Sequence, residues 1–387
     1  MKTNYSARIT HLKQEGAYAV LAKANQLESS GRDIIHFEIG QPDFGTFRNI
    51  CLSGVRAIRQ GKTRYTPPAG IQALRAAIAS DAGERRGIQV HPDEVVVSPG
   101  GKPNLFFPTL ALIDSGDEVI YPNPGFPTYE AMIKVAGGIP VPVPLIEEKR
   151  FSIDLDVFEK KVTDRTRLII LNSPSNPTGG IIPYADLKHI AEIAKKKNIW
   201  VMSDEIYARF AYDGFKVPSI ASFPDMKQQT IIVDGFSKTY SMTGWRLGYG
   251  IMPIELAKRM ELLLTHSVGS TAQFTQIAGL EALTGPQIAV ENMVVEFQRR
   301  RDLMVDGLNS LPGFHCEKPQ GAFYAFPNIS GTGISSIELA DSLLVNAGVA
   351  LLPGSAFGDF GKDHLRLSYA TSMENIQKGI ERIRKML

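Results

Sequence analysis

The sequence has little cysteine and almost no net charge. Its two cysteines, Cys51 and Cys316, lie far apart and form no metal-ligand spacing. This excludes a disulfide framework and favours a reducing compartment, so we expect a cytoplasmic protein. Lysine and arginine number 42 against 40 aspartate and glutamate residues, which leaves a net charge of +2. This balance argues against a main task of binding nucleic acid or a membrane surface.

Long hydrophobic runs are also missing. No window reaches about 18 uninterrupted apolar residues, the length that crosses a bilayer. The N-terminus has no apolar stretch after its first lysine, so we expect no signal peptide. Hydrophobic residues nevertheless make up 43 % of the 387 residues. This content is typical of a globular protein of two or three domains, with room for a cleft between them.

The middle of the chain alternates β-branched runs with amphipathic stretches. The expected strands are residues 94–98, 118–121, 139–145, 167–172, 200–203, 230–234 and 245–252, and the clearest expected helix is 184–197. Such alternation predicts βαβ units, and therefore a large three-layer α/β domain with a mainly parallel sheet. Sheets of this kind bind ligands at the carboxyl ends of their strands.

After about residue 285 the pattern changes to that of a smaller α+β domain. We expect helices at 287–309, 336–347 and from 374, with strands at 322–326, 349–352 and 365–369. Residues 15–30 indicate one more helix. The predicted organisation is an N-terminal arm and helix (1–45) that joins the small domain, a large domain (46–285) and a small C-terminal domain (286–387). The basic runs at 195–197 and 299–301 are interpreted as solvated helix faces.

Lys238 is the first candidate for chemistry. It follows an apolar strand, Ser237 precedes it, and Arg246 follows eight residues later. A guanidinium with a nearby hydroxyl is a good receptor for a phosphate dianion. A lysine beside a phosphate group is what a pyridoxal phosphate Schiff base requires. The alternative is an ordinary surface lysine in a loop.

The remaining requirements of that cofactor are met at other predicted strand ends. Asp204 ends one strand and could face the protonated ring nitrogen, unless it merely caps a helix. Tyr207 and Asn176 could donate to the ring oxygen, although Asn-Pro-Thr-Gly also forms an ordinary turn. Gly101 and Lys102 open a strand-to-helix glycine loop whose amides favour an anion. We therefore expect a phosphate at this loop.

Two further residues could complete the site. Phe126 could lie over the cofactor ring, although a core position is the commoner fate of phenylalanine. Arg366 interrupts an apolar strand. If it points inward it needs an anionic partner, such as a substrate carboxylate held bidentately. If it points outward, a salt bridge on an exposed strand face would explain it.

Taken together, these segments resemble the class I/II aminotransferases of the aspartate aminotransferase superfamily, which are pyridoxal phosphate enzymes of fold type I. The resemblance extends from about residue 15 to the C-terminus. The motifs that carry it, in chain order, are Gly40-Gln-Pro-Asp-Phe, Tyr65-Thr-Pro-Pro-Ala-Gly, Asn176-Pro-Thr-Gly, Asp204-Glu-Ile-Tyr, Ser237-Lys, Arg246, Gly321-Ala-Phe-Tyr, Pro353-Gly-Ser-Ala-Phe-Gly and Leu365-Arg-Leu-Ser. Each motif alone is unspecific, but the whole set in this order is specific.

The resemblance implies a role for each candidate and no metal. Lys238 would be the Schiff-base and proton-shuttling lysine, and Asp204 would pair with the ring nitrogen. The other implied contacts are Tyr207 and Asn176 with the ring oxygen, Ser237, Arg246 and the amides of Gly101 and Lys102 with the phosphate, Phe126 with the ring face, and Arg366, Gly40 and Asn176 with the substrate α-carboxylate. Tyr65 would reach the phosphate of a partner subunit, which implies a homodimer with shared sites.

The resemblance also implies the reaction, a ping-pong transfer of an amino group from an L-amino acid to a 2-oxo acid. Lys102 matches a lysine that meets a distal substrate carboxylate in some relatives, which favours aspartate and 2-oxoglutarate. Glu15-Gly-Ala17 replaces the serine and threonine typical of those relatives, which weakens this interpretation. Aromatic, aliphatic or basic donors, and a C–S β-lyase activity, therefore stay open.

Overall fold

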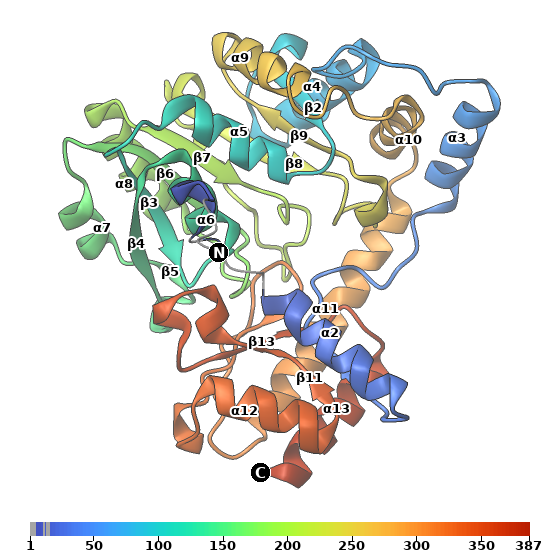
Figure 1. Ribbon diagram of the computed structural model, residues 1–387, viewed down its shortest axis with the longest axis vertical. Coiled ribbons are helices and arrows are strands. Elements are labelled where there is room, and N and C mark those ends of the chain that lie inside the picture. Colours follow the sequence, from blue (N-terminus) through green and yellow to red (C-terminus); the bar gives the residue numbers. More distant parts are fainter. Residues whose placement is uncertain (1–4, 11, 13–15) are drawn as a thin grey trace.

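The computed structural model describes residues 5–10, 12 and 16–387. An eight-stranded sheet lies at its centre (Figure 1). In spatial order its strands are β2 (Val95–Ser98), β9 (Gly248–Ile251), β8 (Thr230–Gly235), β7 (Trp200–Asp204), β6 (Thr166–Asn172), β3 (Glu118–Asn123), β4 (Ile139–Ile146) and β5 (Ser152–Ile153). Strands β8, β7, β6, β3 and β4 pair in parallel, whereas β9 is antiparallel to both neighbours and β5 is antiparallel to β4. The predicted mainly parallel sheet is confirmed.

Helices cover both faces of this sheet. Successive strand residues point to opposite faces, so that Leu168 and Ile170 pack on one side while Ile169 and Leu171 pack on the other. The first side is covered by α5 (Lys102–Leu112), α6 (Thr128–Ala136) and α9 (Ile254–Thr265). The second is covered by α4 (Gln72–Arg86), α7 (Leu155–Lys161), α8 (Tyr184–Lys197) and α10 (Gln273–Thr284), and α3 (Arg48–Arg59) packs against α10. The three-layer α/β architecture is therefore confirmed.

The predicted strands and helices of this region agree closely with the structure, with one exception. The expected helix at 184–197 has these bounds in the structure. The expected strand at 245–252 is shorter, because only Gly248–Ile251 is extended. Thr243–Trp245 forms a 3₁₀ turn, and Arg246 has a φ of 54°, in the left-handed region. This turn separates Lys238 from the strand that follows it.

The C-terminal part of the chain forms two small sheets. One has the antiparallel order β10 (Tyr324–Ala325), β13 (Leu365–Ser368), β12 (Leu352–Pro353). In the other, β1 (Ile35–His36) pairs in parallel with β11 (Val349–Ala350). The helices here are α2 (Gly16–Ser29), α11 (Ile288–Asn309), α12 (Ser336–Ser342) and α13 (Met373–Met386). The N-terminal segment therefore joins the C-terminal one, as Figure 1 shows for α2.

Two expectations for this part need correction. The single strand expected at 349–352 is split between β11 and β12, because its two halves pair with different strands. The helix expected at 336–347 changes to a π-helical turn at Leu343–Ala347. Glu15, the expected start of the first helix, lies outside the described residues. The domain boundaries at 45 and 285 stay predictions.

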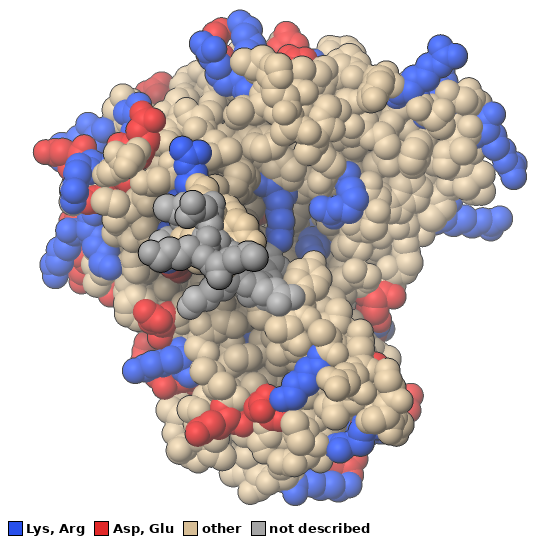
Figure 2. Space-filling view, viewed as in Figure 1, with Lys and Arg blue, Asp and Glu red and all other residues tan. Residues whose placement is uncertain are grey.

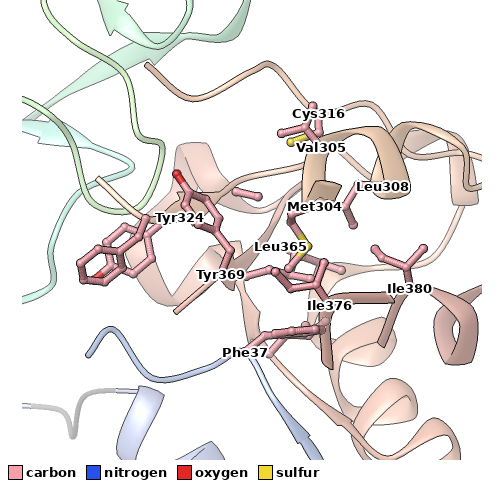
Figure 3. Packing of buried hydrophobic residues seen from close by; sticks show 14 of the residues in the cluster. Phe37, Met304, Val305, Leu308, Cys316, Tyr324, Leu365, Tyr369, Ile376 and Ile380 are labelled. Carbon is pink, nitrogen blue, oxygen red and sulfur yellow. The ribbon is translucent and has the colours of Figure 1, made fainter. Parts of the chain in front are cut away.

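A second core holds the C-terminal part together (Figure 3). Phe37, directly after β1, packs with Met304 and Leu308 of α11 and with Ile376 and Ile380 of α13. All five side chains are at most 5 % exposed. Burial of large apolar side chains such as these is the main favourable term in folding, so this core fixes the N-terminal segment against the last helix.

The arginine run at 299–301 is partly buried, so the prediction of a solvated face is wrong for two of its members. The side chain of Arg301 is 0 % exposed and pairs with Asp213 and Asp302. That of Arg300 is 8 % exposed and pairs with Asp43 and Glu296. Planar guanidinium groups tolerate burial when carboxylates hold them. Lys195 and Lys197, by contrast, are largely exposed.

The longest described helix is α11, with 22 residues. Neither it nor any other helix in the described part of the chain combines the length and the hydropathy that crossing a membrane requires.

Candidate active site

A cavity of about 1560 Å³ opens at the carboxyl ends of β6, β7 and β8. Figure 2 shows basic side chains set back in the hollow between the upper and lower parts of the molecule. All the predicted site residues except Tyr65 line this cavity: Gly40, Gly101, Lys102, Phe126, Asn176, Asp204, Tyr207, Ser237, Lys238, Arg246 and Arg366. The tertiary fold thus brings together residues that are spread over more than 300 positions of the sequence.

Strand register explains why the polar side chains meet. Asn172, the last residue of β6, lies opposite Asp204, the last residue of β7. Nδ2 of Asn172 donates a hydrogen bond to the carbonyl oxygen of Asp204 at 3.0 Å. Its Oδ1 accepts from the backbone amide of Asn176 at 2.8 Å. The ends of two adjacent parallel strands therefore hold Asp204 and Asn176 in a fixed relation.

Lys238 carries a half-buried side chain. Its Nζ donates to the carbonyl oxygen of Gly40 and lies 6.0 Å from the ring centre of Tyr207 and 5.8 Å from that of Phe323. Burial, and then the positive charges of Arg366 and Arg246, lower the pKa of Lys238 to about 8. An amine with such a pKa is partly neutral at physiological pH, as a nucleophile or a proton acceptor must be.

Asp204 is buried and is oriented by two donors. The Tyr129 hydroxyl donates to its Oδ2 at 2.8 Å, and the Ile206 amide donates to its Oδ1 at 3.3 Å. Burial raises the pKa of Asp204 to about 6, although these hydrogen bonds favour the ionised form. Sequence reasoning missed Tyr129, which begins no motif. Its position three residues after Phe126 was the available signal, and the two rings pack edge to face at 5.7 Å.

Tyr207 is linked to a second residue that lacks a predicted role. Its hydroxyl forms a hydrogen bond with the hydroxyl of Tyr324 at 2.7 Å, and both side chains are buried. Tyr324 closes the Gly-Ala-Phe-Tyr motif. A Cβ atom on Gly40 would lie 2.1 Å from the Tyr324 oxygen. Position 40 therefore needs glycine so that Tyr324 and Lys238 can both approach its backbone.

Arg366 points inward from β13, the first of its two alternatives, and it is only 4 % exposed. Its Nη1 donates to Oδ1 of Asn176 at 3.3 Å, and its Nη2 donates to the carbonyl oxygen of Glu38. The guanidinium lies over the rings of Tyr324 at 4.6 Å and Phe357 at 5.0 Å. These contacts fix its plane at the cavity wall, so the alternative of an exposed salt bridge is wrong.

A second group of residues in the cavity lining suits an anion. Gly101 is the N-cap of α5, where free backbone amides and the helix dipole favour negative charge. Arg246 lies against the same loop, because a Cβ atom on Gly100 would be 2.1 Å from its Nη2. Lys102 lies with its Nζ 5.4 Å from the ring centre of Phe126. A helix N-terminus, the Arg246 side chain and Ser237 thus belong to the same cavity lining.

Two predicted residues stand apart from this arrangement. Tyr65 is 97 % exposed and does not line the cavity of its own chain. Glu15, considered for the substrate side chain, lies outside the described residues, whereas Ala17 of the same segment does line the cavity.

The fold and the cavity together define an enzyme with an amine, a carboxylate and two guanidinium groups in a cavity at the carboxyl edge of an α/β sheet. The family description "Aminotransferase class I and II" matches residues 32–383. The chain therefore belongs to the class I and II aminotransferases, and it is an aminotransferase.

Individual relatives agree with this assignment over the whole chain. The chain is 44 % identical to the probable aspartate/prephenate aminotransferase of Aquifex aeolicus, with 100 % of this chain and 99 % of the relative covered. The aspartate aminotransferase of Thermus thermophilus with maleate is 38 % identical, covers 99 % of both chains and has a TM-score of 0.95. An aromatic aminotransferase of Pyrococcus horikoshii is 39 % identical, covers 95 % of this chain and 98 % of its own, and has a TM-score of 0.90.

Proposed function

We propose that the enzyme is a pyridoxal-phosphate-dependent aminotransferase with aspartate as amino donor and 2-oxoglutarate as acceptor. The observation that carries the proposal is the placement of three groups in one cavity. Lys238 lies in the loop after β8, Asp204 ends the adjacent strand β7, and the α5 N-terminus and Arg246 line the same cavity as an anion site.

The residues present fit this cofactor by their chemistry. A phosphate needs amides and cations, which Gly101, Ser237 and Arg246 supply. An aldehyde needs an amine with a lowered pKa, which Lys238 supplies. A ring nitrogen that must stay protonated needs a buried carboxylate, which Asp204 supplies. Phe126 lines the same cavity and is placed to cover a ring, and Tyr207 and Asn176 provide donors for the ring oxygen.

Bound pyridoxal phosphate supplies an aldehyde that condenses with amines and a ring that delocalises the negative charge left by proton removal. Lys238 would be the residue that holds the cofactor covalently, and its amine, when free, would take up the proton from the substrate α-carbon and deliver it to the cofactor. A pKa near 8 leaves enough neutral amine for this task at physiological pH. Asp204, fixed by Tyr129, keeps the ring nitrogen protonated.

Substrate orientation is assigned to Arg366 and its neighbours in the cavity lining. Arg366 holds the α-carboxylate, and Asn176 and the backbone of Gly40 lie beside it. The Arg366 guanidinium contacts two aromatic rings and donates a hydrogen bond to the Glu38 carbonyl oxygen. Because these contacts already restrict its side chain, it loses little further conformational freedom when substrate binds. This favours a fixed direction of the bond from the α-carbon to its hydrogen.

Two observations support aspartate as the donor. Lys102 lines the cavity and can meet a second carboxylate, and similar proteins are named aspartate aminotransferases. A similar structure is named an aromatic aminotransferase, and Ala17, Leu21 and Ile39 form an apolar part of the cavity lining. Aromatic donors are therefore the second candidate.

A homodimer with shared sites is part of the proposal. Tyr65 is almost fully exposed in one chain and is assigned to the phosphate of a partner subunit. Helix α3 exposes Leu52, Val55 and Ile58, which are 43 to 50 % exposed. Large exposed apolar side chains on one helix are typical of a protein contact, and this surface supports the second copy. A cytoplasmic location stays a prediction from cysteine content.

The test is an absorbance titration of purified enzyme loaded with pyridoxal phosphate. Aspartate alone, without a 2-oxo acid, should convert the visible band to that of the amine form of the cofactor, and Lys238→Ala should show neither this band nor turnover. Conversion by aromatic amino acids only would support the second candidate. Release of pyruvate and ammonia from cystathionine would indicate a β-lyase instead, and a protein that binds no cofactor would contradict the whole proposal.

A further inference from the structure

A buried cluster of charged side chains lies outside the cavity, at the C-terminal end of α4. Arg86 is the last residue of this helix, and its side chain is 3 % exposed. Its Nε donates to Oε2 of Glu205 at 2.6 Å, and its Nη2 donates to Oδ2 of Asp234 at 3.0 Å. A charge buried this fully is tolerated only when opposite charges hold it. Arg86 therefore bridges the two carboxylates.

Both carboxylates are surrounded by hydrogen-bond donors. Apart from Arg86, Glu205 accepts from two hydroxyls at 2.6 and 2.9 Å, and Asp234 accepts from a guanidinium, a phenol and a backbone amide at 2.7 to 3.0 Å. These donors belong to Ser203, Ser219, Arg85, Tyr249 and Gly235. Arg85 and Arg86 form ion pairs with these carboxylates. Although burial by itself raises the pKa of Asp234, Arg85 and Arg86 hold it below its ordinary value.

These charges are attached directly to the active-site strands. Glu205 follows Asp204 in the chain, and its amide donates to the carbonyl oxygen of Val233 on β8 at 2.8 Å. Asp234 is on β8, four residues before Lys238. The cluster is thus attached to the ends of β7 and β8, the two strands that lead to Asp204 and Lys238.

Asp204 lies beside this cluster in the sheet, because Glu205 follows it in the chain and Val233, its register partner on β8, directly precedes Asp234. Burial raises the pKa of Asp204 most, the Tyr129 and Ile206 hydrogen bonds lower it, and the negative charges of Asp234 and Glu205 raise it again. Lys238, from the loop after β8, also faces Asp204, and it is positively charged when protonated. If a negative charge beside Asp204 lost its counterion, protonated Asp204 would be favoured.

We propose that Arg86 is a positioning residue for the active site: by neutralising Glu205 and Asp234 it keeps Asp204 ionised, and Asp204 in turn keeps the cofactor ring nitrogen protonated. The inference rests on the proposed function. Arg86 does not line the cavity, so it acts only through its two carboxylate partners. Arg85 still pairs with Asp234 when Arg86 is removed, which leaves Glu205 as the unbalanced charge.

The experiment uses the holoenzyme loaded with pyridoxal phosphate that carries nitrogen-15 in its ring. The nitrogen resonance of the wild type should lie at the protonated position at neutral pH. Arg86→Gln should move it toward the deprotonated position and should lower kcat at pH 7 about twofold, because a rise of about one unit in the pKa of Asp204, from about 6, lowers its ionised fraction from about nine tenths to about one half. Arg86→Lys, which keeps the charge, should behave as the wild type.

A compensating variant separates charge from packing. Glu205→Gln in the Arg86→Gln chain removes the unbalanced charge, so the nitrogen resonance should return to the protonated position. Arg75→Gln is the matched control. This arginine also belongs to α4, but it pairs with Asp93 and with the carbonyl oxygens of Pro92 and Val95. Its loss should leave the resonance unchanged.

The outcomes distinguish this inference from the proposed function. If wild-type enzyme binds no cofactor, the proposed function fails. If the cofactor binds and its nitrogen keeps the protonated position in Arg86→Gln, the role of Arg86 is overturned. If Arg86→Gln does not fold, the nitrogen resonance is measured in the double variant and in Arg86→Lys instead. A deprotonated nitrogen in either of these variants would contradict charge balance as the cause.

Discussion

Lys238 shows how single residues acquire reactivity in this chain. Its amine lies among aromatic rings and near Arg366 and Arg246, where the protonated form is disfavoured by lost hydration and by like charge. The surrounding guanidinium groups serve anions and at the same time lower the pKa of the lysine. One set of side chains therefore performs both tasks.

The pH dependence of cofactor binding tests this description. The pKa of Lys238 falls from 10.5 to about 8, so the neutral amine of the cofactor-free enzyme becomes dominant above pH 8 and not above 10.5. The rate of reconstitution with pyridoxal phosphate should therefore rise with pH and reach half its maximum near pH 8. Stopped-flow absorbance measures this rate. Arg366→Gln should move the midpoint to higher pH, and a wild-type midpoint near 10.5 would contradict the assignment.

At the scale of elements, the site depends on close contact between β9 and the loop that opens α5. Gly248, the first residue of β9, lies so near this loop that an added Cβ atom would be 2.5 Å from the carbonyl carbon of Gly100 and 2.6 Å from the Gly101 nitrogen. Ser98 reinforces the loop, because its hydroxyl donates to the Gly100 oxygen and accepts from Nδ2 of Asn104, each at 2.6 Å. The anion site is thus shaped by backbone packing.

Gly248→Ala should displace this loop, because backbone atoms cannot give way as a flexible side chain can. Overpacking of this kind costs about 1–3 kcal/mol, and we expect the affinity for pyridoxal phosphate to fall about tenfold or more, as measured by equilibrium titration of the cofactor-free enzyme. Gly244→Ala is the matched control, since a Cβ atom there meets nothing within 4 Å. Equal affinities of the two variants would show that the contact is unimportant.

At the scale of the whole molecule, one chain leaves a proposed site residue unused. Tyr65 is exposed and outside the cavity of its own chain, while α3 exposes an apolar row. A second copy of the chain would explain both features, because it would cover the row and would receive Tyr65 at its phosphate end.

Tyr65→Phe and Lys238→Ala chains, mixed and reassociated, should give heterodimers with one intact site. In that site Lys238 comes from one chain and Tyr65 from the other. Activity per Lys238-containing chain should therefore rise above that of Tyr65→Phe alone, as a coupled assay of the 2-oxo acid product measures. Activity that is only the sum of the two separate preparations would rule out shared sites, provided that light scattering confirms mixed dimers.

The sequence by itself determined the class of fold and most members of the cavity. Alternating strand and helix patterns predict a parallel sheet, and residues that follow its strands, such as Asp204 and Lys238, must meet at one edge because parallel strands end there together. The motifs then place Gly40 and Arg366 in the same cavity. A local sequence pattern is enough to predict the place of Asp204 and Lys238, because the topology of a parallel sheet fixes where its strands end.

Only the tertiary structure decided the partners of these residues. Tyr129 and Asp204 are 75 positions apart, Tyr207 and Tyr324 are 117 apart, and Arg86 and Glu205 are 119 apart. No local pattern predicts such pairs, since each depends on how separate helices and strands pack. The buried charges of Arg86, Asp234 and Glu205 are the clearest case. In the sequence they are ordinary charged residues at element ends, and burial together at fixed distances gives them control over Asp204.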